Sequence, residues 1–143
     1  GTLIASTESG LEANHVPFLL SEATSPSGVL RCHVARANSI WKSLSEQQEV
    51  LVVFQGEGAY VSPSLYEAKA KDGKVVPTWN YIAVHAYGTP RIVTDPAWLH
   101  GVISDLTDAH EAARDAPWHV SDAPSDYIAK MLGAIVGIEI DQD

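Results

Sequence analysis

The chain alternates short β-rich segments with turns, and this pattern constrains its fold more than any other feature. Segments rich in β-branched and aromatic residues occur at residues 1–7, 11–20, 29–34, 49–55 and 134–140. Most of the connections between them are short and contain Gly, Pro or Ser. Parallel strands need crossover connections of about a dozen residues or more, so short turns favour antiparallel pairing. We therefore expect a mainly β (α+β) fold, an antiparallel barrel with peripheral helices.

Glycine and proline indicate where these strands bend or end. Pro17 cannot donate to a sheet ladder, so it predicts an edge or a bulge within the returning strand at residues 11–20. Gly56-Glu57-Gly58 is predicted to be a hairpin turn. Residues 78–87 are predicted to form one long strand, which Gly88-Thr89-Pro90 ends in a further turn.

Three helices and one loop are predicted between the strands. Asn38 is a good N-cap for a short helix, and Asp95-Pro96 places a capping carboxylate before a proline at the first helical position. Residues 124–132 form another short helical pattern, with Gly133 as its stop. Residues 21–28, rich in Ser and Pro, are predicted to be a loop.

Composition limits the function classes. The 143 residues suffice for one domain with its own core, and the net charge of −9 makes a nucleic-acid duplex a disfavoured partner for this surface. No apolar run approaches the roughly 20 residues that span a bilayer, so no membrane partner is expected. The single cysteine, Cys32, excludes an internal disulfide and fits a reducing compartment. We expect a cytoplasmic protein.

Several chemical motifs are missing from the sequence. The chain has neither a GxSxG elbow nor a phosphate-binding glycine loop of the GxxxxGK[ST] or GxGxxG type. The histidines form no H-x-x-x-H pair, and Cys32 has no CxxC companion, so no metal site is expected. The six histidines are His15, His33, His85, His100, His110 and His119.

Residues 60–88 combine aromatic strands with a polar loop that carries Lys69, Lys71 and Lys74. The packet Pro77-Thr78-Trp79-Asn80-Tyr81 places a rigid turn, a hydroxyl, an indole, an amide and a phenol side by side. This mixture suits a surface that grips a flat, polar, partly charged ligand. The alternative is that Trp79 and Tyr81 are ordinary core or interface residues.

A second candidate lies where the third strand meets the first helix, in the run His33-Val34-Ala35-Arg36-Ala37-Asn38. A helix N-terminus offers unpaired N–H groups, and Arg36 adds a planar cation, so the run is suited to one phosphate group. A capped helix with a solvated arginine is the alternative. The strand at Asn14-His15-Val16-Pro17 is expected to face this turn, and Cys32 to be a small buried residue.

Seven segments of the chain carry a family resemblance. They are GLEANHVPFLL, LRCHVARANSIW, EVLVVFQGEGAYVSPSLY, KVVPTWNYIAVHAYG, DPAWL, LTDAHE and MLGAIVGIEI. Together they resemble the PaiB-like family of FMN-binding negative transcriptional regulators, and the KVVPTWNY block is specific. The family is similar to the split β-barrel flavoproteins that include pyridoxamine phosphate oxidase.

The resemblance implies a homodimer with FMN at the interface between two split barrels. It places the flavin-contacting strand on Asn14, His15, Val16 and Pro17. It places the phosphate-binding turn on His33, Val34, Arg36, Ala37 and Asn38. The other subunit is expected to supply Trp79, Asn80 and Tyr81, so the 77–81 packet becomes a wall that closes over the flavin.

The resemblance also sets expectations about the extent of the chain. Residues 1–143 are expected to form a single domain of a longer protein, because family members begin with a further helical segment. They also continue past the last strand into a block similar to K-L-S-Q-N-R. Cys32 stands where relatives commonly have glycine, close to the proposed phosphate turn.

Three functions remain open at this point. The resemblance implies a flavin-responsive repressor, with DNA as a partner only through the family. A flavin-dependent oxidoreductase is the second reading, with His15, His33 and Tyr66 as the proton donors available. The third is a related barrel that binds haem, another planar ligand or only a partner protein.

Overall fold

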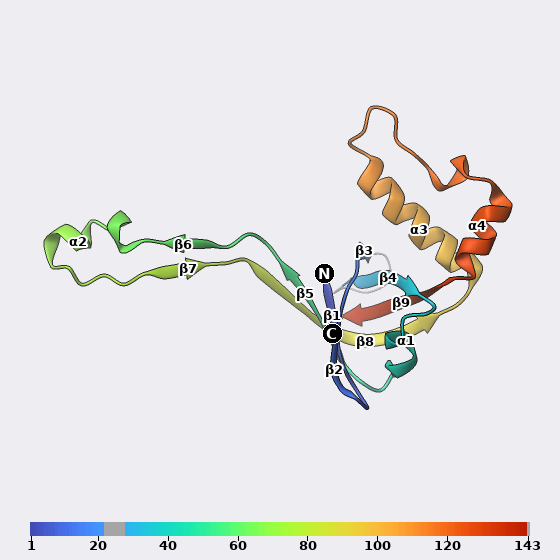
Figure 1. The fold of residues 1–143 in the computed structure, drawn as a ribbon, viewed down its shortest axis with the longest axis horizontal. Coiled ribbons are helices and arrows are strands. Elements are labelled where there is room, and N and C mark those ends of the chain that lie inside the picture. Colours follow the sequence, from blue (N-terminus) through green and yellow to red (C-terminus); the bar gives the residue numbers. More distant parts are fainter. Residues whose placement is uncertain (22–27, 143) are drawn as a thin grey trace.

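The computed structural model describes residues 1–21 and 28–142, and it contains one large antiparallel sheet (Figure 1). The seven strands run in the order β2-β1-β5-β8-β9-β4-β3. Their bounds are β1 Thr2–Thr7, β2 Gly10–His15, β3 Leu19–Ser21, β4 Val29–Ala35, β5 Val50–Gln55, β8 Ala83–Val93 and β9 Ile135–Gln142. A mainly β, antiparallel fold is therefore confirmed. The predicted loop at residues 21–28 falls largely outside the described residues.

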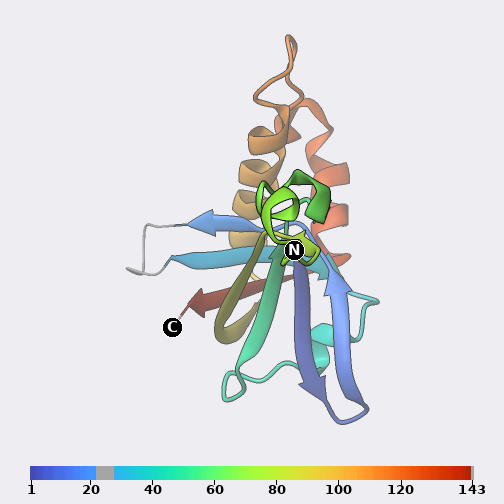
Figure 2. The ribbon, with the colours of Figure 1, turned by 90° about the vertical axis from the view of Figure 1, so that its left-hand side faces the viewer.

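The sheet is strongly curved (Figure 2), and its strands enclose a hydrophobic core. Residues from five strands and from the short helix α1 (Ile40–Ser43) form this core: Leu3, Ala5, Leu30, Cys32, Val34, Ile40, Val50, Val52, Ala86, Val136, Ile138 and Ile140. Within the described residues, no ladder joins the edge strands β2 and β3, so the sheet is not closed into a barrel. We call this curled sheet, with its helices, the body.

Two helices cover one face of the sheet, and we call residues 95–132 the helical layer. It contains α3 (Pro96–Glu111), the 3₁₀ turn η2 (Val120–Asp122) and α4 (Ser125–Leu132). Asp95 begins α3 as predicted, since its carboxylate accepts a hydrogen bond from the Trp98 N–H at 2.8 Å. The Trp98 ring lies directly over Gly137 of β9, where any side chain would collide with it.

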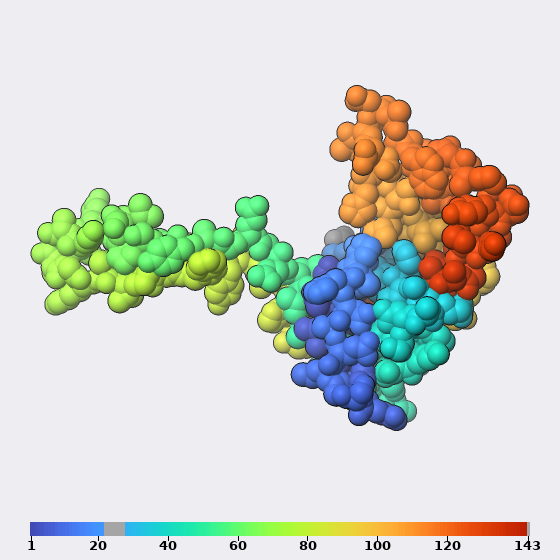
Figure 3. Space-filling view, in the orientation of Figure 1, coloured from blue at the N-terminus to red at the C-terminus, as the bar shows by residue number. Residues whose placement is uncertain are grey.

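Residues 56–82 leave the body as a long hairpin, which we call the arm (Figures 1 and 3). It consists of β6 (Ala59–Val61) paired with β7 (Thr78–Asn80), and its outer end holds the 3₁₀ turn η1 (Pro63–Leu65) and α2 (Ala68–Lys71). None of residues 53–85, all of which the structure describes, is buried. The arm therefore has no hydrophobic core of its own.

The glycine-rich run at residues 56–58 does not form the predicted hairpin turn. β5 and β8 pair up to Gln55 and Ala83, and the Gly56 N–H then donates to the Ile82 carbonyl at 2.9 Å. The two chains continue side by side into β6 and β7. The predicted long strand at 78–87 is accordingly divided into β7 and β8 at Tyr81 and Ile82.

Two other boundaries differ from prediction. The strand at residues 11–20 is broken around Pro17, and its two parts, β2 and β3, lie at opposite edges of the sheet. Gly88 and Pro90 do not form a turn but lie within β8. A side chain at Gly88 would collide with the Asp141 carbonyl, so the glycine permits close approach of β9. Pro90 is tolerated because β8 has lost β5 as a neighbour beyond Gly88.

Candidate functional site

Two of the segments singled out in the sequence meet on the body. The Asn38 side-chain amide donates to the Asn14 side-chain oxygen at 2.6 Å, which joins the end of β2 to the turn after β4. The Asn38 side-chain oxygen accepts from the Ile40 N–H at 2.9 Å, whereas the N-cap of α1 is Ser39, one residue later than predicted. Both asparagines are half-buried. The structure thus brings the predicted flavin strand and the predicted phosphate turn together.

A groove of about 540 Å³ opens beside the end of β2. His15 is held at its rim, because its Nδ1 lies 3.0 Å from the Thr2 hydroxyl. Val16 is also fixed, since its N–H donates to the Gly1 carbonyl at 3.0 Å. The groove is lined by Gly1, Thr2, His15, Val16, Pro17, Val53, Phe54 and Gln55. Its volume lies in the range of ordinary ligand pockets, and its lining mixes apolar and polar groups.

Sequence reasoning missed the groove residues Phe54 and Gln55. Both belong to the β-rich segment predicted at residues 49–55, yet Gln55 is exposed and Phe54 only partly buried. Phe54 packs edge-on against Phe18, with the ring centroids 5.7 Å apart. The available signal was their position directly before the Gly-Glu-Gly run, where β5 leaves the body.

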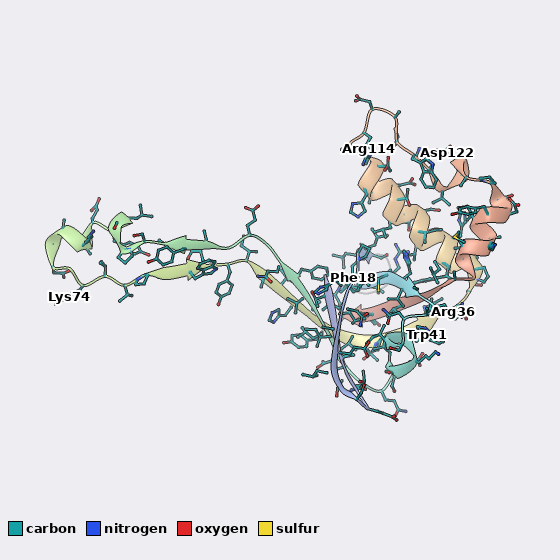
Figure 4. The ribbon with its side chains drawn as sticks, in the orientation of Figure 1. Phe18, Arg36, Trp41, Lys74, Arg114 and Asp122 are labelled. Carbon is teal, nitrogen blue, oxygen red and sulfur yellow. The ribbon has the colours of Figure 1, made fainter. Side chains whose placement is uncertain are left out.

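Arg36 is fixed in the turn that follows β4 (Figure 4). Its Nε donates to the Gly133 carbonyl at 2.8 Å and its Nη2 to the Ile135 carbonyl at 3.0 Å. The indole of Trp41 donates to the Arg36 carbonyl at 3.0 Å, which holds the backbone of the turn. Two guanidinium donors are thus committed to the end of α4 and the start of β9, and the charge stays at an exposed position. Because α1 has only four residues, the cation rather than a helix dipole provides the positive field here.

The other residues of this turn have different environments. Val34 points into the core, so only its backbone is available to a ligand, whereas Ala37 is exposed. His33 is half-buried on the opposite face of β4, and its Nδ1 has no hydrogen-bond partner within the described residues. Burial lowers the pKa of His33, which favours its neutral form.

Cys32 is a fully buried residue of the core, as the sequence indicated. Burial raises the pKa of its thiol to about 12. A thiol that stays protonated is a poor nucleophile, so Cys32 has a packing role.

The aromatic packet lies on the arm, away from the other candidate residues. Trp79 and Tyr81 are 61% and 71% exposed, and Asn80 is also exposed. The Trp79 indole lies across Gly58, where an added Cβ would come within 2.8 Å of its nitrogen. β7 lies well away from β2 and β4 (Figure 1), so this chain does not bring the packet to its own Asn14–Asn38 site.

The donor set can be tested against the cofactor that the resemblance implies. The groove with its mixed lining, the Asn14–Asn38 pair next to His15 in the chain, and the fixed Arg36 two residues before Asn38 together fit a planar ring system with an anionic tail. Within the described residues, no three His, Cys, Asp or Glu side chains gather closely enough to hold a metal ion. Nor is any helix in that part of the chain long and apolar enough to cross a bilayer.

Relatives of known sequence match most of the chain. An uncharacterized protein of Saccharomyces cerevisiae is 43% identical over 106 residues, which cover 73% of this chain and 63% of the yeast protein. The protease synthase and sporulation protein PAI 2 of Bacillus subtilis is 29% identical over 140 residues, covering 98% of this chain and 64% of that protein. The chain spans 63–66% of the length of the curated relatives that it matches.

Solved flavin-binding proteins share the fold. The FAD and heme binding protein from Mycobacterium smegmatis superposes with a TM-score of 0.61, at 16% identity, over 96% of this chain and 58% of that chain. At this level of identity the likeness concerns the fold, and it supports the split-barrel class. A family model described as "Putative FMN-binding domain" matches residues 1–142. The chain therefore belongs to this FMN-binding family, and FMN is the cofactor that the family assigns to it.

Proposed function

We propose that the chain forms a homodimer with two composite FMN sites, and that this dimer is a flavin-dependent regulator. The observation that carries the proposal is the position of the arm. Its Trp79-Asn80-Tyr81 packet projects away from the body that holds the remaining candidate residues. In a symmetric dimer, the packet of each copy meets the groove of the other copy.

The body residues divide into two groups with different roles. His15, Val16 and Pro17 line the groove and, with the adjacent Asn14, would contact the ring system of the flavin. Arg36, together with the backbone of Val34, the side chain of Asn38 and the exposed Ala37, would hold the phosphate. His33 lies under the helical layer and would act on the site by positioning β4.

The exposed surface of the arm supports a partner chain. An isolated two-stranded hairpin is at best marginally stable in water. The exposed large apolar residues of the arm are Tyr60, Leu65, Tyr66, Val76, Trp79, Tyr81 and Ile82. They make up half of all such residues in the described chain, although the arm is less than a fifth of its length. Large exposed apolar patches mark interaction surfaces, so we expect the arm to be covered.

The regulatory role rests on the family resemblance and on relatives that are longer than this chain. We propose that regulation acts through another macromolecule or through further segments, because nine basic residues among eighteen acidic ones repel a DNA duplex. A gel shift with promoter DNA over a range of salt concentrations tests this point. A complex that forms with the chain alone at physiological salt would contradict it.

The absorption spectrum of the full chain, purified with FMN present, is the first experiment. We expect flavin bands at one FMN per chain, and Arg36→Ala should weaken FMN binding by roughly tenfold or more, as for other charge-assisted contacts. Arg114→Ala is the matched control, since Arg114 is exposed in the helical layer and pairs only with Glu111 among the described residues. A Soret band in place of flavin bands would favour a haem-binding relative and overturn the proposal.

A mixing experiment tests whether each site uses two chains. Arg36→Ala and Trp79→Ala variants should each retain little FMN alone. A mixed dimer contains one intact site, built from the Trp79 arm of the first variant and the Arg36 body of the second. We therefore expect mixing to restore close to half of the wild-type FMN content of each mixed dimer. Absence of any restoration, with dimers still forming, would contradict a composite site.

A further inference from the structure

The charge of the chain is divided unevenly between its parts. The arm contains three carboxylates and three lysines, so it is formally neutral. The outer part of the arm, residues 68–76, carries Lys69, Lys71 and Lys74 but only Asp72, which gives a net charge of +2. We call these nine residues the arm tip. All three lysines are exposed, and Lys74 lies at the far end of the molecule in Figure 4.

The helical layer has the opposite charge. Seven carboxylates lie in residues 95–132 against one arginine and one lysine, a net charge of −5 that is more than half of the total. The acidic residues are Asp95, Asp105, Asp108, Glu111, Asp115, Asp122 and Asp126. Arg114 and Asp122 lie at the end of this layer that is remote from the sheet (Figure 4). The arm tip and the helical layer of one chain lie far apart (Figure 3), so this complementarity is not satisfied within the chain.

The helical layer also exposes apolar surface among these carboxylates. Tyr127 and Met131 lie one turn apart on α4 and are 54% and 38% exposed. A groove of about 350 Å³ runs between α3 and α4, lined mainly by Val120, Ile128, Ala129 and Leu132. An apolar surface with a charged rim is the usual composition of a protein interface.

We propose that the arm tip of one copy docks on the helical layer of a second copy, with its lysines against the carboxylates of that layer. This inference rests on the homodimer of the proposed function and adds the surface that receives the arm. The lengths of the arm and of α4 agree with this docking. Arg36 is bonded to the carbonyl of Gly133, at the end of α4, so a partner Trp79 placed beside Arg36 lies next to this helix. Lys74 is five residues further along the arm, which corresponds to about 16 Å of extended chain. The eight residues of α4 span about 12 Å, so Lys74 can reach along the whole of this helix.

Charge-reversal variants of the full chain test the inference. The first variant is Lys69→Glu/Lys71→Glu/Lys74→Glu in the arm tip, and the second is Asp115→Lys/Asp126→Lys in the helical layer. Asp115 and Asp126 are exposed and take no part in the ion pairs of the described helical layer, so their reversal leaves these contacts intact. We expect each variant to dimerise about tenfold or more weakly than the natural chain, measured by analytical ultracentrifugation.

Mixing the two variants gives the decisive result. In a heterodimer, the acidic arm tip of the first variant meets the lysines introduced at positions 115 and 126 of the second, and the unchanged arm tip of the second meets the unchanged layer of the first. At these two positions the heterodimer pairs opposite charges, whereas each homodimer places like charges there. We expect heterodimers to form more tightly than either homodimer of the variants. Recovery on mixing also excludes misfolding as the cause of weak dimerisation.

Lys130→Glu is a matched control for the single change Lys71→Glu, because Lys130 is an exposed helical lysine that belongs to the layer itself. It should not weaken the dimer.

Unchanged dimerisation of both charge-reversal variants, with FMN still bound, would overturn this inference and leave the composite flavin site standing. A chain that is monomeric at every concentration would overturn the homodimer itself. If the arm-tip variant loses DNA binding while the dimer stays intact, the partner of the arm tip is nucleic acid and not the helical layer, and the inference is overturned.

Discussion

The body and the arm are made from the same kind of antiparallel strand but differ in what stabilises them. In the body, Val52, Ile138 and Ile140 are fully buried between the curled faces of the sheet. In the arm, β6 and β7 pair by backbone hydrogen bonds and place their apolar side chains in solvent. The body is thus completed by its own residues. The arm requires something outside the described chain, and we propose that it is a second copy.

The largest expected difference is between two isoleucines. Ile138→Ala removes methyl groups from a fully buried position of the body and should lower the free energy of unfolding by roughly 2–5 kcal/mol. Ile82→Ala acts on a side chain that is 68% exposed in the arm, and should change the stability of the monomer by about 0.5 kcal/mol or less. Urea denaturation at concentrations that keep the protein monomeric measures both. Equal losses would remove the distinction between body and arm.

Two glycines sharpen the same contrast. Gly88→Ala places a Cβ against the Asp141 carbonyl of β9, a backbone atom that cannot move alone, and should destabilise the body by about 1–3 kcal/mol. Gly58→Ala collides with the Trp79 indole, which can swing aside, and its Cβ comes no nearer than 3.3 Å to the backbone, at the Asn80 carbonyl oxygen. We expect this change to leave thermal stability almost unaltered but to weaken FMN binding. Thermal unfolding and FMN titration separate the two effects, and normal FMN binding by Gly58→Ala would contradict the role of Trp79.

Helix capping provides a smaller comparison. Asp95→Ala removes the carboxylate that accepts the Trp98 N–H and should cost about 1 kcal/mol of stability. Ser62→Ala removes the hydroxyl that accepts the Ser64 N–H at 3.2 Å, at the start of η1 in the arm. Because the arm contributes little to the cooperative core, we expect almost no change in the midpoint of denaturation. A loss as large as that of Asp95→Ala would indicate that the arm unfolds together with the body.

The smallest effect is a pH dependence confined to the body. The hydrogen bond that the His119 ring donates to the Asp108 carboxylate raises the pKa of His119. Its contribution to stability is therefore present below pH 6.5, the usual value, and is lost as the pH rises through the folded-state pKa. Burial lowers the pKa of His33, so that histidine costs stability as the pH falls below 6.5. The two act in opposite directions.

Asp108→Asn removes the first contribution and leaves the second. We expect this variant to lose more thermal stability than the natural chain between pH 7.5 and 5.5, by an amount read from melting curves at each pH. Lys71→Glu, which changes only the arm, should keep the natural pH profile. An identical profile for Asp108→Asn would mean that the His119 contact contributes nothing in solution.

Sequence reasoning succeeded where the physical signal is local. Asp95-Pro96 predicts the start of α3 because capping depends on a few adjacent residues. Sequence reasoning failed at Gly88 and Pro90, because glycine and proline normally indicate a turn. The deciding contact there is with Asp141, some fifty residues away in the sequence, and with the end of the β5 ladder.

The candidate site was foreseen in part. The strand at Asn14 was expected to face the turn at Asn38, and the structure joins the two residues although β2 and β4 are not neighbours in the sheet. The sequence did not reveal that Phe54 and Gln55 line the groove, because a strand end at a pocket has the same composition as one in a core. Nor does a run such as Trp79-Asn80-Tyr81 indicate whether its aromatic rings are buried in their own chain or exposed on an arm.

The arm is a direct continuation of β5 and β8, which are the third and fourth of the seven strands in the sheet. A mechanical load on the arm is therefore delivered to the middle of the sheet rather than to an edge. The first ladder pair to feel it joins Gln55, which lines the groove, to Ala83. A force on the outer end of the hairpin would therefore act first on the strand residue that forms part of the groove wall.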